Sequence, residues 1–392
     1  MLTTKKVRLK LTPEQEIQFR KSCGVARWAY NYLLSEKQRV YDEYISNGKT
    51  GKKTISEGEV RKYINNVLKP TTHQWLKEVG SNVMKQAVKD ADNAYKNFFN
   101  GLSKRPKFKS KKSSKQSFYV NYESLTRING GFKGEKLGFV KTSEPLPKLA
   151  DGEKYANPRI TFDGKYWYLS VVYNIEPKSV QLTNESLGID LGVKNLAICS
   201  NGVTYKNINK SKRVKALKRT LKREQRKLSR KIECNIIGYA NNRKPIFRTP
   251  LQGCKNIQKQ IHYIKLINRK INSIRNNHLH QATAEIVKTK PFQIVMETLN
   301  ITGMMKNKHL AKAIAEEKLF EFKRQIKYKA ETYGIKVVEV PTFYPSSKTC
   351  SVCGCINTNL KLSDRVYHCD SCGITLDRDL NAAINLANYK VI

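Results

Sequence analysis

The 392-residue chain is poor in acidic side chains: it has 32 Asp and Glu against 74 Lys and Arg, a formal net charge of +42. Such an excess excludes an ordinary globular domain without a charged partner, because self-repulsion opposes compaction unless a polyanion relieves it. Counterion release from phosphates would favour a nucleic acid in that role. The charge is spread along the whole chain and is not gathered on one amphipathic helix, which disfavours a membrane surface.

The sequence also lacks long apolar runs. None approaches the ~18–20 residues of a membrane span, and residues 1–6 have no apolar signal-peptide core. We therefore expect a cytoplasmic, nucleoid-associated protein with no membrane partner. In that compartment the nine cysteines are interpreted as thiols or metal ligands, not as disulfides. Only six histidines are present, and we expect none of them to be catalytic.

The first half of the chain predicts a β-rich domain with a helical domain inserted into it. The β-rich domain consists of residues 1–11 and 116–183, where Asp163-Gly164 between two alternating runs predicts a hairpin. It is expected to be a small twisted sheet or barrel. Residues 12–115 predict the helical domain, which starts at a capping box formed by Thr12 and Gln15. Its patterns place helices from Pro13, over 25–38 and over 81–100.

Residues 184–392 predict a third domain with a recognisable order of elements. Basic residues 211–231 and 255–285 carry apolar residues at helical spacing, which favours an antiparallel helical hairpin within 211–285. The other elements are expected as strands 187–192, 195–200, 203–205, 292–296 and 335–340, and as helices 310–333 and 379–388. Without insertions this order is β-β-β-α-β-α-β-α, the connectivity of the RNase H fold to which RuvC nucleases belong. The fold class is thus α+β multidomain.

Three carboxylates stand on elements that converge in such a fold. Asp190 lies within an apolar strand, Glu297 ends another, and Asp379 opens the last helix. An unpaired carboxylate inside a sheet is costly unless something binds it, and Mg²⁺ prefers such oxygen ligands. Two Mg²⁺ ions would activate water and stabilise the leaving oxygen of an in-line displacement. Singly, each acid is better explained as a turn or cap, and Asp377 is an alternative to Asp379, although helical spacing favours Asp379.

Four cysteines form the strongest local motif. Cys-x-x-Cys pairs separated by fifteen residues predict a structural zinc ribbon over 346–376 with one Zn²⁺ and no open ligand position. Gly354 and Gly373 each follow a pair, where the knuckle needs an unusual backbone angle. Cys355 is interpreted as a bystander. The predicted ligands are Cys350, Cys353, Cys369 and Cys372.

Two basic segments are candidate nucleic-acid contacts. The alternative for residues 101–115 is a solvated linker, but the net charge favours phosphate binding. The candidates are Lys104, Arg105, Lys107, Lys109, Lys111 and Lys112 in that segment and Arg213, Lys218, Arg219, Lys222 and Arg223 on the basic helix.

Several of these motifs resemble those of one family. Residues 188–197 (GIDLGVKNLA) resemble the first RuvC motif of the TnpB proteins encoded by bacterial insertion sequences, and residues 295–300 (VMETLN) resemble the second. Residues 346–354, 369–373 and 377–383 resemble the family's zinc ribbon and third motif. The resemblance covers nearly the whole chain and departs at none of the three acids or four cysteines.

The resemblance implies an activity and partners. TnpB proteins are RNA-guided DNA endonucleases, ancestral to type V CRISPR effectors. The chain is accordingly expected to bind a guide RNA from the transposon end and to cut double-stranded target DNA in a bacterial cytoplasm with one RuvC site. Mg²⁺, or Mn²⁺ as a substitute, would be the cofactor. Residues 1–11 and 116–183 would be the wedge domain, and residues 12–115 the recognition domain. Alternatives are a nuclease-inactive RNA-guided repressor, a transposase-like strand-transfer enzyme and a non-catalytic nucleic-acid-binding module.

Overall fold

The computed structural model describes residues 1–392 except 113, 178, 343, 362–363 and 390–392. Residue 113 falls in the predicted basic segment and residues 362–363 fall in the predicted zinc ribbon, so these positions lie outside the described structure. The chain folds as two compact units, residues 1–175 and residues 176–392. Both mix helices and strands. No described helix combines the length and the apolarity that a bilayer crossing requires.

The first unit contains a seven-stranded antiparallel sheet in the order β2-β6-β7-β1-β5-β4-β3. Its strands are β1 (Leu2–Lys10), β2 (Ser117–Tyr119), β3 (Thr126–Ile128), β4 (Gly131–Gly134), β5 (Gly138–Thr142), β6 (Ala156–Phe162) and β7 (Trp167–Asn174). β1 pairs with β7 from Leu2↔Asn174 to Arg8↔Tyr168. The N-terminal strand therefore joins a sheet whose other strands all follow residue 116.

The predicted hairpin at Asp163-Gly164 is confirmed between β6 and β7. The Asp163 carboxylate accepts hydrogen bonds from the backbone N–H groups of Lys165 (2.9 Å) and Tyr166 (2.8 Å). Gly164 has φ 98°, a conformation that disfavours any residue with a Cβ. The local chemistry of the turn thus explains why the chain reverses there.

The helical part of the first unit begins with one long helix. Its helices are α1 (Pro13–Ser46), α2 (Glu57–Tyr63), η1 (Ile64–Leu68), η2 (Gln74–Glu78) and α3 (Ser81–Phe99). The predicted capping box of Thr12 and Gln15 is confirmed, and the two helical patterns after Pro13 lie on the same helix. Phe19 of α1 contacts the rings of Phe118 and Trp167 in the sheet. Helices and sheet share one hydrophobic core, so the predicted boundary near residue 116 falls inside one compact unit.

The second unit is built on a five-stranded sheet in the order β10-β9-β8-β13-β14. The strands are β8 (Thr183–Leu191), β9 (Asn195–Cys199), β10 (Thr204–Lys206), β13 (Pro291–Glu297) and β14 (Lys336–Val340). β8, β9 and β10 form an antiparallel meander, whereas β13 lies parallel to both β8 and β14. The five strands of this sheet occur along the chain in the order predicted from the sequence.

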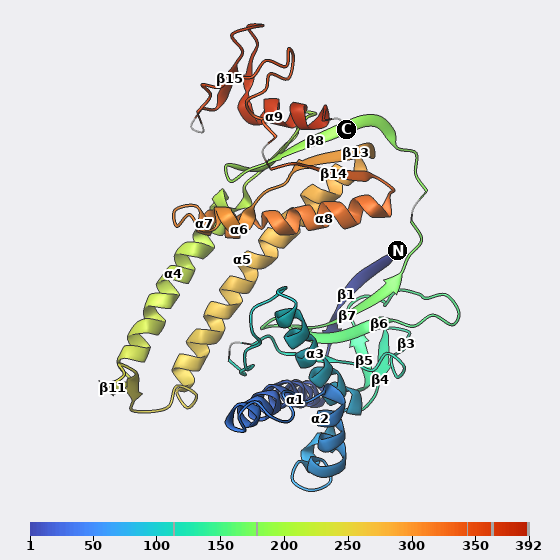
Figure 1. The fold of residues 1–392 in the computed structure, drawn as a ribbon, viewed down its shortest axis with the longest axis vertical. Helices are drawn as coiled ribbons and strands as arrows, with labels where there is room; N and C mark the ends of the chain where they lie inside the picture. The colour runs from blue at the N-terminus through green and yellow to red at the C-terminus, as the bar shows by residue number, and fades with distance from the viewer. Residues whose placement is uncertain (113, 178, 343, 362–363, 390–392) are drawn as a thin grey trace. The chain divides into compact units, whose positions relative to one another are not determined.

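Helices cover both faces of this sheet (Figure 1). α5 (Lys255–Lys288) and α8 (Leu319–Thr332) pack on one face, where Ile189, Ile286 and Phe322 share a core. α9 (Arg378–Ala387) packs on the other face, where Leu386 lies with Val295 and Val340. Small residues bring α9 close: a Cβ on Gly188 would lie 1.9 Å from the Ala383 carbonyl oxygen. The predicted close packing of this helix on the sheet is therefore confirmed.

The predicted helical hairpin is also confirmed. α4 (Lys212–Glu233) and α5 lie side by side, and the two-stranded ribbon of β11 (Ile236–Tyr239) and β12 (Pro245–Phe247) joins their ends (Figure 1). Val214, Ile267 and Ile271 form the apolar contact between the two helices. The hairpin keeps many of its basic side chains exposed.

The prediction of one helix over 310–333 is wrong. The segment forms α7 (Ala311–Glu317) and α8, with Lys318 in the left-handed conformation (φ 57°) between them, and the short α6 (Ile301–Met304) precedes it. The break follows from two competing attachments. α7 is held to the helical hairpin through Glu316 and Glu317, whereas Leu319 and Phe322 of α8 are buried in the sheet core.

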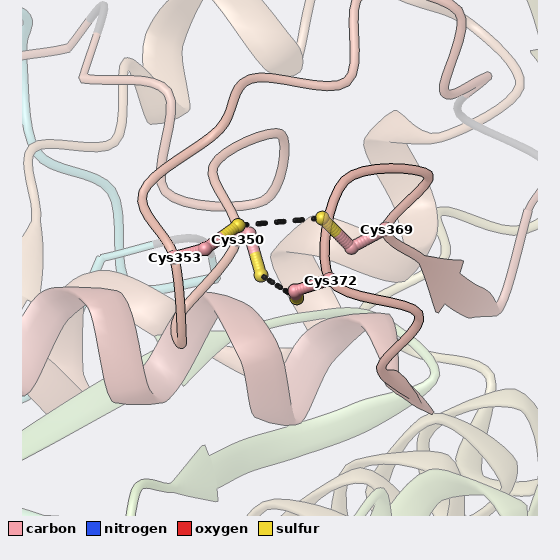
Figure 2. Close-up of side chains that lie close together, drawn as sticks. All are labelled: Cys350, Cys353, Cys369 and Cys372. Atoms are coloured by element: carbon pink, nitrogen blue, oxygen red, sulfur yellow. Dashed lines mark hydrogen bonds between the residues drawn. The ribbon is translucent and has the colours of Figure 1, made fainter.

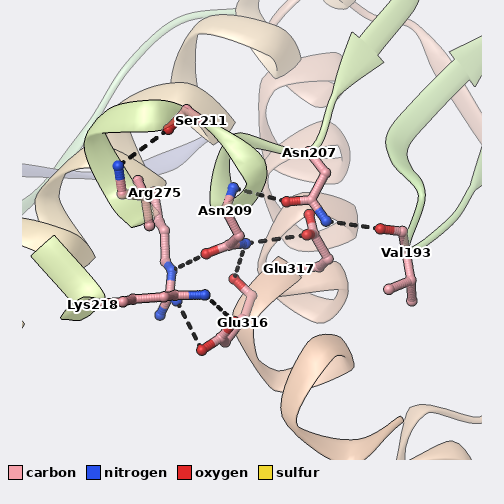
Figure 3. A network of polar contacts seen from close by, with 9 residues as sticks. Val193, Asn207, Asn209, Ser211, Lys218, Arg275, Glu316 and Glu317 are labelled. Carbon is pink, nitrogen blue, oxygen red and sulfur yellow. Dashed lines mark hydrogen bonds and ion pairs between the residues drawn. The ribbon is translucent and has the colours of Figure 1, made fainter. Parts of the chain in front are cut away.

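A buried polar network makes that attachment (Figure 3). Asn209 donates to the Glu317 carboxylate (3.1 Å) and to the Glu316 carbonyl (3.2 Å), and its own side-chain oxygen accepts a hydrogen bond from Arg275 (2.6 Å). Lys218 forms an ion pair with Glu316 at 2.5 Å. Burial raises the pKa of Glu317. Buried polar groups are costly without partners. These bonds therefore attach the helical hairpin to α7 at the end where α4 begins.

Candidate active site and metal centre

Asp190 lies in the middle of the sheet on the α9 face. Alternation along β8 places Ile189 and Leu191 in the opposite core, as the sequence predicted. Its side chain is half-buried, and desolvation together with the nearby charges of Glu297 and Asp379 raises the pKa of Asp190 to about 8. A carboxylate so placed is destabilised in its ionised form unless a cation accompanies it.

Glu297 is the last residue of β13, beside Asp190 in the sheet. Met296 pairs with Ile189 and Val295 pairs with Gly188, so one further step in the parallel register places Glu297 next to Asp190. Val295 faces α9, and Glu297, two residues later, lies on that face as well. The register therefore places the two carboxylates next to each other on the face of the sheet that α9 covers.

Asp379 stands in the first turn of α9, and Asp377 has a different position. Asp377 is the N-cap, and its carboxylate accepts hydrogen bonds from the backbone N–H groups of Asp379 (3.0 Å) and Leu380 (3.1 Å). The charge of Asp379 raises the pKa of Asp190 more than that of Asp377 does. The guanidinium of Arg365 lies 4.0 Å from Asp379. The geometry thus favours Asp379 as the third member of the carboxylate group.

The three carboxylates fit a hard divalent cation chemically. Their oxygens are the ligands that Mg²⁺ prefers, and a cation would offset the repulsion that raises the pKa of Asp190. Among the described residues, however, the four cysteines are the only group of possible ligands whose donor atoms all lie within 4.8 Å of one another. The charges of Glu297 and Asp379 act on Asp190, but the three acids do not form so tight a group.

The four predicted cysteines form a compact cluster in which their sulfur atoms converge (Figure 2). The Sγ atoms of Cys350 and Cys372 are 3.6 Å apart, and those of Cys353 and Cys369 are 3.5 Å apart. Such a set fits tetrahedral zinc. Backbone N–H groups of Cys372 and Ser371 lower the pKa of Cys369 to about 6, which favours the thiolate that zinc binds.

The knuckle glycines and the fifth cysteine take the positions expected of them. Gly354 has φ 77° and Gly373 has φ 72°, and their N–H groups donate to the carbonyls of Cys350 (3.0 Å) and Cys369 (2.8 Å). Cys355 lies outside the cluster. β15 (Val366–His368) and β16 (Thr375–Asp377) pair beside the cluster, and β16 leads directly into α9. The zinc centre therefore adjoins the helix that carries Asp379.

Two buried asparagines of α9 attach that helix to the start of the cysteine segment. Asn381 donates to the Thr349 carbonyl (2.7 Å) and accepts from the Ser351 N–H (2.9 Å). Asn385 donates to the carbonyls of Ser346 (2.7 Å) and Thr349 (2.6 Å). These bonds attach α9 to residues 346–351.

Ser346 is a site residue that reasoning from the sequence missed. Its side chain is 2% exposed, and its hydroxyl donates a short hydrogen bond to Oε1 of Glu297. Lys323 of α8 donates to the Glu297 carbonyl at 2.9 Å. No local sequence pattern predicts either contact. Ser346 lies 49 positions and Lys323 lies 26 positions from Glu297, so only the fold brings them together.

The predicted nucleic-acid contacts occupy two kinds of position. Lys109 is half-buried: its ammonium group lies 3.5 Å from the centre of the Tyr30 ring, and its backbone is bonded to Asn31. Lys218 is paired with Glu316. The remaining candidates are exposed: Lys104, Arg105, Lys107, Lys111, Lys112, Arg213, Arg219, Lys222 and Arg223.

Three family models match successive parts of the chain. Residues 1–46 match the helix-turn-helix domain of IS605 OrfB proteins, residues 170–308 match the IS605 OrfB model described as a probable transposase, and residues 320–386 match the Cas12f1-like TNB domain. The chain thus resembles proteins of the TnpB/IS605 family and Cas12f1. The TNB match spans α8, β14, the cysteine cluster and most of α9.

Two relatives match nearly the whole length of the chain, and a third matches about half of it. The chain is 28% identical over 388 residues to a putative RNA-guided DNA endonuclease of Streptomyces pristinaespiralis, covering 97% of this chain and 87% of the relative. It is 27% identical to the putative RNA-guided DNA endonuclease InsQ of Escherichia coli K12, covering 97% and 90%. Over 230 residues it is 28% identical to the endodeoxyribonuclease Cas12f1 of Sulfoacidibacillus thermotolerans, covering 56% of this chain and 50% of that one.

A solved structure shares the fold. The chain in a cryo-EM structure of a Cas12f1–sgRNA–target DNA complex matches with a TM-score of 0.58 at 16% identity, and 99% of each chain is covered.

Proposed function

We propose that this chain is a transposon-encoded, RNA-guided DNA endonuclease whose Asp190, Glu297 and Asp379 form one RuvC-like, RNase H-fold active site. The proposal is supported by the pairing of β8 with β13, which makes Asp190 and Glu297 neighbours, and by the charges of Glu297 and Asp379, which raise the pKa of Asp190. The names of the relatives InsQ and Cas12f1 support the guided reaction and the DNA substrate.

Each carboxylate has a structural role in the proposed reaction. Mg²⁺, or Mn²⁺ in its place, would activate a water and stabilise the leaving oxygen when bound. Asp190, on the central strand of the sheet, would supply ligand oxygens to the metal. Glu297 is oriented by the hydroxyl of Ser346. Asp379 is placed by the packing of α9 on Gly188. All three acids are present, which favours a nuclease over an inactive repressor.

The remaining parts have supporting roles. One structural Zn²⁺ on the four cysteines would hold the segment before α9. The sheet that contains β1 would serve as the wedge domain and the helices of the first unit as the recognition domain, as in the family. With a net charge of +42, the chain can neutralise the phosphates of both a structured RNA and its DNA target, while base pairing reads the sequence.

The direct test of the site is Asp190→Ala in the complex with RNA. We expect Mg²⁺-dependent cleavage to be abolished while RNA and DNA affinities stay within about twofold, since one carboxylate adds no phosphate contact. Glu331→Ala is the matched control, because Glu331 is an exposed acid near the end of α8 in the same unit. Full cleavage by the Asp190 variant would refute the assignment.

The guide is tested by sequencing RNA that co-purifies with the protein. A discrete RNA that ends in a variable segment is expected. Random cellular RNA would instead indicate a basic nuclease without a guide.

A further inference from the structure

A cleft of about 640 Å³ lies in the first unit where the second half of α1 meets the end of α3. Its volume is within the ~300–1,000 Å³ range of small-ligand sites. Tyr41, Phe98 and Phe99 line it. Phe99 is 75% exposed and Tyr41 is 42% exposed, so flat apolar faces are presented to solvent there. The ring of Tyr95 stacks behind Phe99 at 6.1 Å.

The rim of this cleft is positively charged. Lys53, Lys96 and Arg105 line it, and the only carboxylate among its described lining residues is Asp92. That carboxylate is already neutralised by Lys37 at 2.8 Å and Lys96 at 3.0 Å. An anionic ligand would therefore meet no uncompensated negative charge.

Aromatic faces beside cationic groups are the chemistry that holds an unpaired nucleotide. A base stacks on an aromatic ring whatever its identity, and the phosphate contacts lysine or arginine. Bases of RNA loops and ends are open to stacking, whereas those of duplex DNA are not. An apolar segment of another protein would gain nothing from the cationic rim.

We propose that this cleft binds an unpaired nucleotide of the bound RNA, with its base against Phe99 and Tyr41 and its phosphate near Arg105. This inference rests on the proposed function, because it needs RNA as a partner. It assigns a specific role to the part of the first unit that the active site does not use.

The test compares variants of the full chain with a single-stranded oligouridylate of about 12 nucleotides that carries 4-thiouridine. Phe99→Ala should weaken binding roughly 5- to 150-fold without changing the dependence on salt, because stacking is lost but no phosphate contact is. Phe99→Trp should retain binding. Arg105→Gln should lower the salt slope by about one. Ultraviolet cross-links should map to Tyr41 or Phe99.

Leu102→Ala is the matched control. Leu102 is also an exposed apolar residue, at 76%, and is not among the lining residues, so its loss should leave RNA affinity unchanged. Thermal melting checks that all variants fold. The proposal would be overturned if Phe99→Ala bound RNA as tightly as wild type, or if Leu102→Ala lost as much RNA affinity. It would also be overturned if Phe99→Ala lost as much affinity for single-stranded DNA as for RNA, or if the wild-type protein were a dimer that Phe99→Ala dissociates. If wild-type protein binds RNA and cuts DNA while Phe99→Ala is unaffected, the cleft assignment alone fails. If wild-type protein binds no RNA, the proposed function fails with it.

Discussion

Asp377 caps α9, whose first turn contains Asp379: one carboxylate oxygen of Asp377 accepts hydrogen bonds from the backbone N–H groups of Asp379 and Leu380. Two acids two positions apart therefore have separate structural roles. The cap fixes where α9 starts, and the start of α9 fixes where the Asp379 carboxylate lies.

This relationship predicts opposite results for the two acids. Asp379→Asn should reduce cleavage by at least ~100-fold, as loss of a group that stabilises charge at a reacting centre does. Asp377→Asn should cut nearly as well as wild type because Asn is an equally good N-cap, whereas Asp377→Ala should lower stability by about 1 kcal/mol. Cleavage rates and melting temperatures measure these effects. Equal loss of cleavage in both Asn variants would contradict the assignment.

The raised pKa of Asp190 predicts a pH dependence of stability for the metal-free protein. The folded-state pKa is about 8, and the unfolded value is ~3.9. The folded state thus holds this proton more tightly, so the free energy of unfolding should fall as the pH rises from about 4 to about 8. Asp190→Asn removes that fall, and its melting temperature should exceed that of wild type above pH 8.

Added Mg²⁺ should reverse the difference, because a cation stabilises the ionised carboxylate only in wild type. Melting curves at pH 5, 7 and 9, with and without Mg²⁺, provide the measurement. Parallel pH profiles for the two proteins would show that Asp190 is not destabilised by burial.

Zinc removal should affect cleavage through α9. Wild-type protein should contain one equivalent of zinc, and Cys350→Ser should lose it. Cleavage should then fall about tenfold or more, since the segment that contacts Asn381 and Asn385 loses its fixed shape. Cys355→Ser is the control, because this neighbouring thiol lies outside the cluster. Elemental analysis and cleavage assays decide the outcome, and a folded, fully active protein without zinc would contradict it.

Ser346→Ala should act on Glu297 without acting on the zinc centre. Loss of the hydroxyl leaves one Glu297 oxygen without its orienting donor, so cleavage should fall ~10- to 100-fold and the Mg²⁺ concentration for half-maximal rate should rise. Zinc content and melting temperature should change little. Ser351→Ala, where only the backbone N–H contacts α9, is the comparison. A loss of equal size in Ser351→Ala would point to a general disturbance of the segment.

Local patterns predicted the parts of the structure that local forces determine. The β8 alternation placed Asp190 opposite its apolar neighbours, the capping box located the start of α1, and the Cys-x-x-Cys spacing located the cluster. The break at Lys318 was not predicted, because it arises from contacts that α7 makes with Asn209 and Lys218 about a hundred positions away.

The same reasoning explains the limits at the site itself. Helical spacing favoured Asp379 over Asp377, but only the capping contacts give Asp377 a role of its own. Ser346 was missed because its hydroxyl meets Glu297 through tertiary packing. Lys109 looked like its basic neighbours in the sequence, yet its side chain packs over Tyr30.

The most direct test of the central claim is cleavage of a chosen DNA by the purified protein with an RNA whose guide segment has been changed. Two DNA targets that differ only in the guide-matched stretch are offered together with Mg²⁺, to wild-type protein and to Asp190→Ala. The account predicts that wild-type protein cuts only the matching DNA, that the cut moves to the other DNA when the guide is exchanged, and that Asp190→Ala binds without cutting. Cleavage that ignores the guide, or that persists in Asp190→Ala, would contradict it.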